Sequence, residues 1–194
     1  MVGSAIAGKL AQLGHDVMLG SRDPASERMR NLGVSLGVAV GTNAQAAVHG
    51  EWVVNAMPGE PSVEVLRSCE LAGKILVDIA NYNSAVNQPI IVPVGQAIQE
   101  ALPEVLVVKA LNSVSAHLMV DPAELGTPHT VFVAGEDAAA KAAVTDLLKS
   151  FGWRDVIDLG GIAESRAMEQ LIPLWMALER VTSGPQFNLE VARS

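Results

Sequence analysis

A serine and an arginine directly follow a short apolar segment near the start of the chain. Asp16–Gly20 (DVMLG) has the composition of a strand, and Ser21 and Arg22 come next. A guanidinium grips a phosphate through two parallel charge-assisted hydrogen bonds, and a serine hydroxyl adds a donor. In dinucleotide folds an arginine here takes the 2′-phosphate of NADP, whereas an acid binds the ribose of NAD. The pair therefore predicts an NADP(H) site, with Arg28 as a further cation. The alternative is that both arginines are ordinary solvated surface charges. The spacing from Gly3 makes this alternative less favourable for Arg22 but not for Arg28.

Gly3 stands 19 positions before Arg22 and opens a helix rich in small residues. In the fingerprint G-x-G-x-x-G the third glycine allows close packing of helix on sheet, and the amino end of that helix binds pyrophosphate. Val2 and Gly3 are therefore candidate cofactor-binding residues. We expect the first strand and the two earlier glycines of this unit to be absent, which bears on stability and on pyrophosphate binding. Taken alone, Gly3 could equally be a flexible terminal residue.

Polar and turn-forming residues follow three later apolar segments. Open α/β sheets bind ligands at the carboxyl ends of their strands, so these loops are candidates for cofactor contact. Asn, Ser, Pro and Gly also populate ordinary turns, and for any single loop that explanation would suffice. Three consecutive loops of this kind favour a ligand site. The candidates are Ala56, Met57, Pro58, Asn81, Asn112, Ser113 and Ser115.

Lys109 ends an apolar segment, where an unpaired ammonium is unfavourable. It could donate a proton in catalysis, but we favour a structural role, reaching the sheet edge or pairing with an acid such as Asp78. Of the histidines, only His117 falls near the candidate loops. No metal-binding motif is present, and Cys69, the single cysteine, has no partner for an internal disulfide.

Short β-branched segments alternate with helical patterns along the chain, which predicts an α/β fold: a Rossmann-type, doubly wound, mainly parallel sheet with a C-terminal helical segment. Gly14 and Gly152 are the predicted C-caps of two helices. The final helical pattern, about 162–180, contains Pro173, which predicts a kink or break. The expected strands are 16–20, 38–40, 52–56, 74–79, 105–110 and 130–134.

The 194 residues correspond to one domain with a small annex. We expect an NADP-binding Rossmann domain over residues 1–135. Residues 136–194 would form an extension that completes the sheet and covers the acceptor site. The apolar surface expected around Trp175 and Met176 fits either a homodimer or a cover over a ligand.

Composition narrows the function classes. With 49% apolar and 18% charged residues the chain is not of the disordered or coiled-coil type, and its net charge of −8 disfavours nucleic acid or an anionic membrane as a partner. The longest strongly apolar stretch, Leu171–Leu178, is far shorter than the roughly 20 residues of a membrane span. No signal peptide is recognisable, so we expect a cytoplasmic protein.

Five segments in this order carry a resemblance over essentially the whole chain: VGSAIAGKLAQLGHDVMLGSRDP, VVNAMPG, KILVDIANYN, VVKALNSVSAHLM and PQFNLEVAR. They resemble the F420-dependent NADP oxidoreductase family, whose fold also serves as the NADPH domain of STEAP-type metalloreductases. The resemblance implies hydride transfer between NADPH and coenzyme F420, a small-molecule redox acceptor, with Asn112 at the nicotinamide and Ser113 and Ser115 near the acceptor. A flavin or metal reductase and a non-catalytic NADPH-binding sensor stay open as alternatives.

Overall fold

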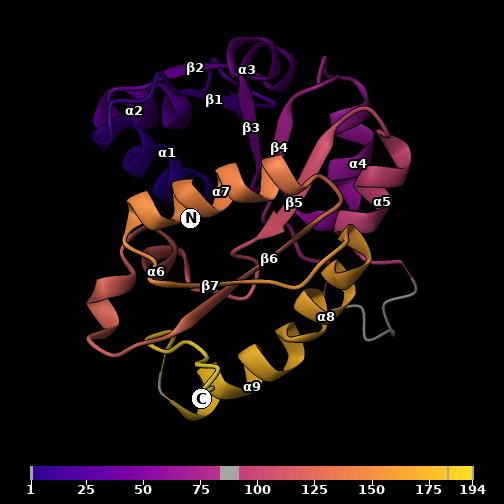
Figure 1. Cartoon of the computed structure of the whole chain (residues 1–194). Coiled ribbons are helices and arrows are strands. Elements are labelled where there is room, and N and C mark those ends of the chain that lie inside the picture. The colour runs from indigo at the N-terminus through magenta and orange to yellow at the C-terminus, as the bar shows by residue number, and fades with distance from the viewer. Residues whose placement is uncertain (1, 84–91, 183, 194) are drawn as a thin grey trace.

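The computed structural model describes residues 2–83, 92–182 and 184–193. Its main sheet has five strands in the order β3-β4-β5-β6-β7, parallel except for the antiparallel pairing of β5 with β6 (Figure 1). A separate parallel pair, β1-β2, precedes it in the chain. The strands are β1 (Met18–Ser21), β2 (Ala39–Thr42), β3 (Trp52–Asn55), β4 (Ile75–Asp78), β5 (Leu106–Ala110), β6 (Thr130–Gly135) and β7 (Asp155–Asp158).

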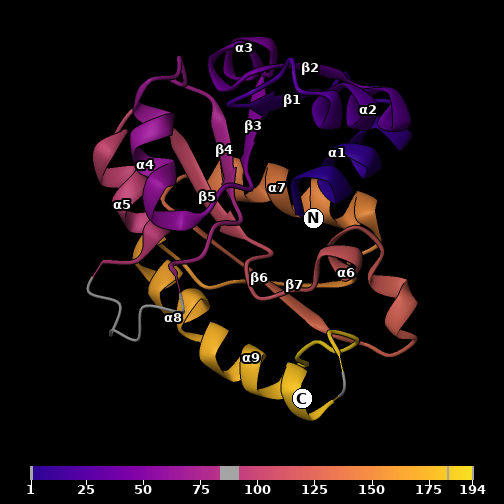
Figure 2. The same ribbon diagram turned by 180° about the vertical axis from the view of Figure 1, so that it is seen from behind.

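Helices cover both faces of the main sheet, as a doubly wound fold requires (Figures 1 and 2). One face packs against α1 (Val2–Gln12), α6 (Ala116–Val120) and α7 (Ala138–Phe151). The other packs against α3 (Asn43–His49), α4 (Gly59–Arg67) and α5 (Val94–Ala101). The remaining helical segments are α2 (Glu27–Leu36), η1 (Pro122–Leu125), η2 (Ile162–Glu164), α8 (Ser165–Gln170) and α9 (Ile172–Val181).

The apolar character of the central strands follows from this double cover. In β4 and β5, Leu76 and Val107 belong to the core beside α4 and α5, whereas Val77 and Val108 belong to the core beneath α7. All four are at most 3% exposed. A parallel strand buried on both faces must be apolar at successive positions, because neighbouring side chains point to opposite faces.

All six predicted strands are present, and the predicted fold class is confirmed. Gly152 caps α7 in the left-handed region, at φ 109°, and Gly14 also has a positive φ of 87°. The final helical pattern breaks at Leu171, and Pro173 lies in the first turn of α9, as the sequence predicted.

Two features differ from the expectation. No residue range was predicted for the strand β7 within the extension 136–194, since Asp155–Asp158 has charged ends and its two apolar residues, Val156 and Ile157, form too short a run to stand out. The expected single sheet is also divided, with a gap between β1 and β3.

The division into domains at residue 135 stays a prediction. Within the described ranges, no helix has the length and apolarity needed to cross a membrane.

Candidate functional site

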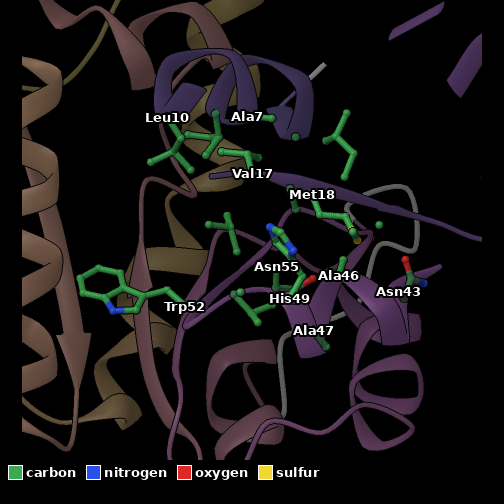
Figure 3. Close-up of a pocket in the computed structure, with 18 of the residues that line it drawn as sticks. Ala7, Leu10, Val17, Met18, Asn43, Ala46, Ala47, His49, Trp52 and Asn55 are labelled. Carbon is green, nitrogen blue, oxygen red and sulfur yellow. The ribbon is translucent and has the colours of Figure 1, made fainter. Parts of the chain in front are cut away.

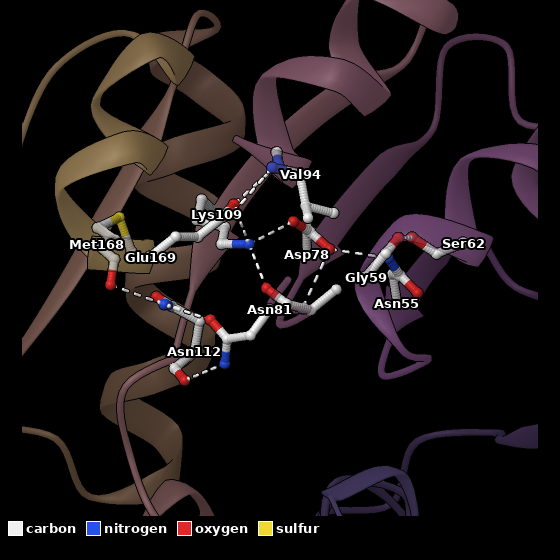
Figure 4. Close-up of polar contacts among 12 residues, drawn as sticks. Asn55, Gly59, Ser62, Asp78, Asn81, Val94, Lys109, Asn112, Met168 and Glu169 are labelled. Carbon is white, nitrogen blue, oxygen red and sulfur yellow. Dashed lines mark hydrogen bonds and ion pairs between the residues drawn. The ribbon is translucent and has the colours of Figure 1, made fainter. Parts of the chain in front are cut away.

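The loops after β4 and β5 are joined by a pair of asparagines at the carboxyl edge of the sheet (Figure 4). Asn81 Nδ2 donates to the Asn112 carbonyl oxygen at 2.7 Å, and Asn112 Nδ2 donates to Asn81 Oδ1 at 2.9 Å. Asn112 Nδ2 also donates to the Met168 carbonyl oxygen at 3.0 Å. The contact with Met168 ties α8 to the same two loops. Two of the predicted site residues are therefore in direct contact.

The orientation of the Asn112 amide follows from these partners. Both groups that face its nitrogen, Asn81 Oδ1 and Met168 O, are acceptors, so the nitrogen must be the donor. Asn112 Oδ1 is left buried and has no hydrogen-bond partner among the described residues. The residue before it, Leu111, has a φ of 59°, which is unusual for a branched side chain. Strained backbone and an unsatisfied acceptor together are typical of a functional loop.

A buried ion cluster lies just beneath these loops. Lys109 Nζ contacts Asp78 Oδ2 at 2.8 Å and Glu169 Oε1 at 2.9 Å, and all three side chains have no exposed surface. The same ammonium donates to the Ala80 carbonyl oxygen. Lys109 therefore has the structural role that the sequence favoured, pairing with Asp78, and it is not placed to reach a substrate.

Glu169 extends the cluster to the helix on the other side of the site. Its carboxylate accepts from the Val94 and Gly95 backbone N–H groups at 2.9 and 3.1 Å, at the amino end of α5. A carboxylate satisfies the unpaired N–H groups of a helix start and matches the helix dipole. Sequence reasoning missed Glu169 because nothing local to α8 distinguishes a buried glutamate from a surface one.

Asn55, the last residue of β3, connects the ion cluster to the loop that follows β3. Its Nδ2 donates to Asp78 Oδ1 at 2.8 Å, and its Oδ1 accepts from the Met57 backbone N–H at 3.2 Å. Gly59 donates to the Asn81 carbonyl oxygen at 3.1 Å, and a Cβ on Gly59 would lie only 2.3 Å from that oxygen. The absence of a side chain at Gly59 thus allows α4 to begin directly against the loop after β4.

The residues predicted to hold the 2′-phosphate lie on the β1-β2 unit. Ser21 ends β1, and its hydroxyl accepts from the Asp23 backbone N–H at 3.1 Å. Arg22 and Arg28 are exposed. Gly3 in the first turn of α1 lies against Ala56, since a Cβ on Gly3 would be 3.6 Å from the Ala56 Cβ. The structure therefore brings Gly3 and Ala56 together. Ser21 ends β1, Arg22 follows it in the loop, and Arg28 lies in α2.

The two serines predicted in the loop after β5 differ in burial and in hydrogen bonding. Ser115 is buried, and its hydroxyl donates to the Pro185 carbonyl oxygen at 2.7 Å, which fixes the C-terminal segment to this loop. Ser113 is half-buried. Like Asn112 Oδ1, the ring nitrogens His117 Nε2 and Trp175 Nε1 are buried and have no hydrogen-bond partner in the described part of the chain. Metal-ligating side chains do not gather anywhere in that part.

Comparison with known proteins places this arrangement in a family. The sequence profile described as "NADP oxidoreductase coenzyme F420-dependent" matches residues 1–82. A crystal structure of a candidate F420-dependent NADP reductase from Arthrobacter sp. FB24 is 41% identical, with a TM-score of 0.91. The match covers 99% of this chain and 95% of that one.

Two curated proteins are also similar. The F420-dependent NADP reductase of Methanocaldococcus jannaschii is 27% identical over 164 residues, which is 79% of this chain and 73% of that protein. The metalloreductase STEAP3 of Rattus norvegicus is 28% identical over 177 residues, 88% of this chain but only 35% of that protein. The chain belongs to the F420-dependent NADP oxidoreductase family.

Proposed function

We propose that this protein transfers hydride between NADPH and coenzyme F420. The observation that carries the proposal is the asparagine pair, Asn81 with Asn112, at the carboxyl ends of two adjacent central strands. Bound NADPH supplies the hydride, and the deazaflavin ring of F420 accepts it. The protein needs to hold two flat rings in contact, and no acid, base or nucleophile is required of it.

The chain offers groups suited to each end of NADPH. Ser21 and Arg22, at the carboxyl end of β1, provide a hydroxyl and a guanidinium for the 2′-phosphate. Val2 and Gly3 lie at the amino end of α1, where backbone N–H groups attract the pyrophosphate. Ala56, Met57 and Pro58 follow β3 between these positions and Asn81.

The nicotinamide end falls to the loop after β5. A carboxamide carries N–H donors, and Asn112 Oδ1 is the unsatisfied acceptor in that loop. The neighbouring Ser113, with the Ser115 hydroxyl that holds the C-terminal segment, would border the acceptor ring. In this arrangement Asn112 orients the ring, and Lys109 beneath it keeps the strand ends in register.

The test is a comparison of hydride acceptors. Purified protein is mixed with NADPH and, separately, F420, FMN, FAD or ferric citrate, and loss of the absorbance of the reduced nicotinamide is followed. We expect turnover with F420 that exceeds turnover with the other acceptors. Faster turnover with a flavin or with ferric iron would assign the protein to the alternative reductases. Binding of NADPH without oxidation by any acceptor would identify a nucleotide sensor.

A pair of variants tests the role of Asn112. Asn112→Ala should lower the turnover number with F420 by roughly 10- to 100-fold, because a misplaced ring loses its attack geometry. Asn31→Ala, on the exposed side of α2, is the matched control and should leave turnover unchanged. Equal turnover for both variants would remove Asn112 from the reaction centre.

A further inference from the structure

Two successive residues of α8, Met168 and Glu169, contact the loop and strand of the candidate site from a distant part of the chain (Figure 4). The Met168 carbonyl oxygen accepts from the Asn112 amide nitrogen at 3.0 Å. The Glu169 carboxylate contacts Lys109 Nζ at 2.9 Å. Because the two residues are adjacent in one short helix, the position of the carbonyl depends on the position of the carboxylate.

The Glu169 carboxylate has three donors around it, and both of its oxygens are engaged. Oε1 lies 2.9 Å from Lys109 Nζ and accepts from the Gly95 backbone N–H at 3.1 Å. Oε2 accepts from the Val94 backbone N–H at 2.9 Å. Glu169 has no exposed surface, so water does not compete for these contacts. They fix α8 to β5 on one side and to the amino end of α5 on the other.

The helix α8 also lies directly on α5. A Cβ on Gly95 would be 2.9 Å from the Ser165 Cβ, closer than two such carbons normally approach. Met168 lies in the last turn of α8, where helix carbonyl groups lack part of their intrahelical partners. Its carbonyl is therefore available to Asn112, and a small shift of α8 on α5 would remove it.

The Met168 carbonyl determines how the Asn112 amide is turned. The amide nitrogen lies between two acceptors, Asn81 Oδ1 at 2.9 Å and Met168 O at 3.0 Å. A single hydrogen bond to Asn81 would leave the amide free to pivot about that bond, whereas two acceptors fix the amide plane. The direction of Asn112 Oδ1, the atom without a partner, is fixed together with it.

We propose that Glu169 is a positioning residue for the nicotinamide ring. By holding α8 in place, it keeps the Met168 carbonyl against the Asn112 amide and so directs Asn112 Oδ1 towards the carboxamide N–H of the ring. The inference rests on the proposed function, in which Asn112 Oδ1 accepts from that carboxamide. Glu169 touches neither nucleotide nor acceptor, because its carboxylate is enclosed between α5 and β5.

A pair of nucleotides measures the direction of Asn112 Oδ1. NADP⁺ has a carboxamide with N–H donors, whereas its 3-acetylpyridine analogue has a methyl ketone in the same place and no donor. Isothermal titration calorimetry gives a dissociation constant for each, and the ratio of the analogue's constant to that of NADP⁺ reports the hydrogen bond. We expect a ratio of about five to ten in the unaltered protein, the value of one such bond. Equal constants would overturn the proposal.

Glu169→Gln is the main variant. Glutamine has nearly the same shape, but its amide nitrogen cannot accept, so it cannot satisfy Lys109, Val94 and Gly95 together. The ratio of dissociation constants should fall below about two, because α8 shifts and the Asn112 amide is released. The substitution also lowers stability, but a uniform loss of stability does not change this ratio. An unchanged ratio in protein that circular dichroism shows to be folded would overturn the proposal.

Gly95→Ala displaces the same helix without changing any charge. Its Cβ pushes Ser165, and with it α8, away from α5, so the ratio should fall as it does for Glu169→Gln. This variant keeps the proposal testable where Glu169→Gln protein does not fold. A ratio at the unaltered value would contradict the dependence on α8.

Leu10→Ala is the control for a loosened fold. Leu10 lies on α1, in the wall of a cavity of about 720 Å³ between β1 and β3, and packs against the core beneath α7 (Figure 3). The lost packing should affect both nucleotides alike and leave the ratio unchanged. A ratio that falls as far as in Gly95→Ala would mean that it follows stability alone, and the proposal would fail.

A double variant shows whether Glu169 acts through Asn112. Asn112→Ala removes the acceptor, so adding Glu169→Gln should change the ratio no further. A further change in the double variant would show that Glu169 acts by another route and would overturn the proposal. All of these are binding measurements without F420. A protein that binds NADP⁺ but transfers no hydride would therefore contradict the proposed function and leave this test intact.

Discussion

The two sheets differ in how much structure covers them. Every strand from β4 to β6 contributes to an apolar core, and Leu76, Val108 and Val133 have no exposed surface. In the β1-β2 pair, Gly20 is exposed and Met18 is half-buried, and no residue of either strand belongs to a core cluster. Two-stranded sheets are only marginally stable in water. The small unit therefore depends on contacts with α1, α2 and α3 rather than on a core of its own.

The two ends of the proposed NADPH site lie on these two differently packed sheets. The groups for the nicotinamide end, Asn81 and Asn112, stand on the well-packed sheet above the Lys109 cluster. The groups for the 2′-phosphate, Ser21 and Arg22, stand on the lightly packed unit. We expect substitutions in the Lys109 cluster beneath the loops of the large sheet to act mainly on stability, and substitutions beside β1 to act mainly on nucleotide affinity.

The largest effect is expected at the buried ion cluster. Lys109→Met leaves the Asp78 and Glu169 carboxylates buried without their cation, and breaking such a pair costs about 3–5 kcal/mol of unfolding free energy. Urea denaturation measures the change. Lys149→Met is the control, because Lys149 makes only an exposed ion pair with Asp146, worth less than about 1 kcal/mol. Similar losses in the two variants would contradict the role of the cluster.

The second effect concerns affinity and belongs to the small unit. Arg22→Ala should raise the dissociation constant for NADPH roughly 10- to 100-fold, the value of charge-assisted hydrogen bonds, and change that for NADH far less. Isothermal titration calorimetry with both nucleotides provides the measurement. Arg154→Ala, an exposed arginine before β7, is the matched control. Equal weakening of NADPH and NADH binding would mean that Arg22 does not contact the 2′-phosphate.

The third prediction compares the sheets without any substitution. Amides of β1 should exchange with solvent at least about tenfold faster than those of β5, because local opening of β1 disrupts few buried contacts. Leu19 and Val108 are suitable reporters of the two regions. Exchange measured by nuclear magnetic resonance in the free protein provides the comparison. Uniform protection of both strands would show that the two sheets unfold as one unit.

The sequence predicted the partner of a buried polar residue where that partner lies in an adjacent strand. Lys109 at the end of an apolar strand required a partner, and Asp78 in the adjacent strand is opposite it in register. Glu169 lies 60 positions further along the chain, and only tertiary packing brings it to the same ammonium. The partners of Asn55 and Asn81 were equally hidden, because a terminal asparagine in a strand looks the same as an asparagine in a turn.

The strand β7 illustrates a different limit. Its apolar residues, Val156 and Ile157, are only half-buried at the edge of the sheet, so no long hydrophobic run marks it. Its place is set by pairing with β6 and by polar ties to the C-terminal segment. Thr130 Oγ1 donates to Asp155 Oδ2 at 2.6 Å and accepts from the Val191 backbone N–H at 3.0 Å, and Arg193 pairs with the same aspartate. Such contacts between distant segments have no signature in sequence.

The smallest effect is expected at this edge and depends on pH. The hydrogen bond from Thr130 and the nearby Arg193 guanidinium hold the pKa of Asp155 below its ordinary value. A carboxyl group whose pKa is lowered by folding stabilises the protein above its unfolded pKa of about 3.9, and this contribution is lost as the pH falls through the lower folded value. Thr130→Val should therefore lower the unfolding free energy by about 1 kcal/mol at neutral pH and by less as the pH falls below about 3.9. Urea denaturation of both proteins across this range tests the idea, and a constant difference at every pH would show that the hydroxyl acts only through the Val191 contact.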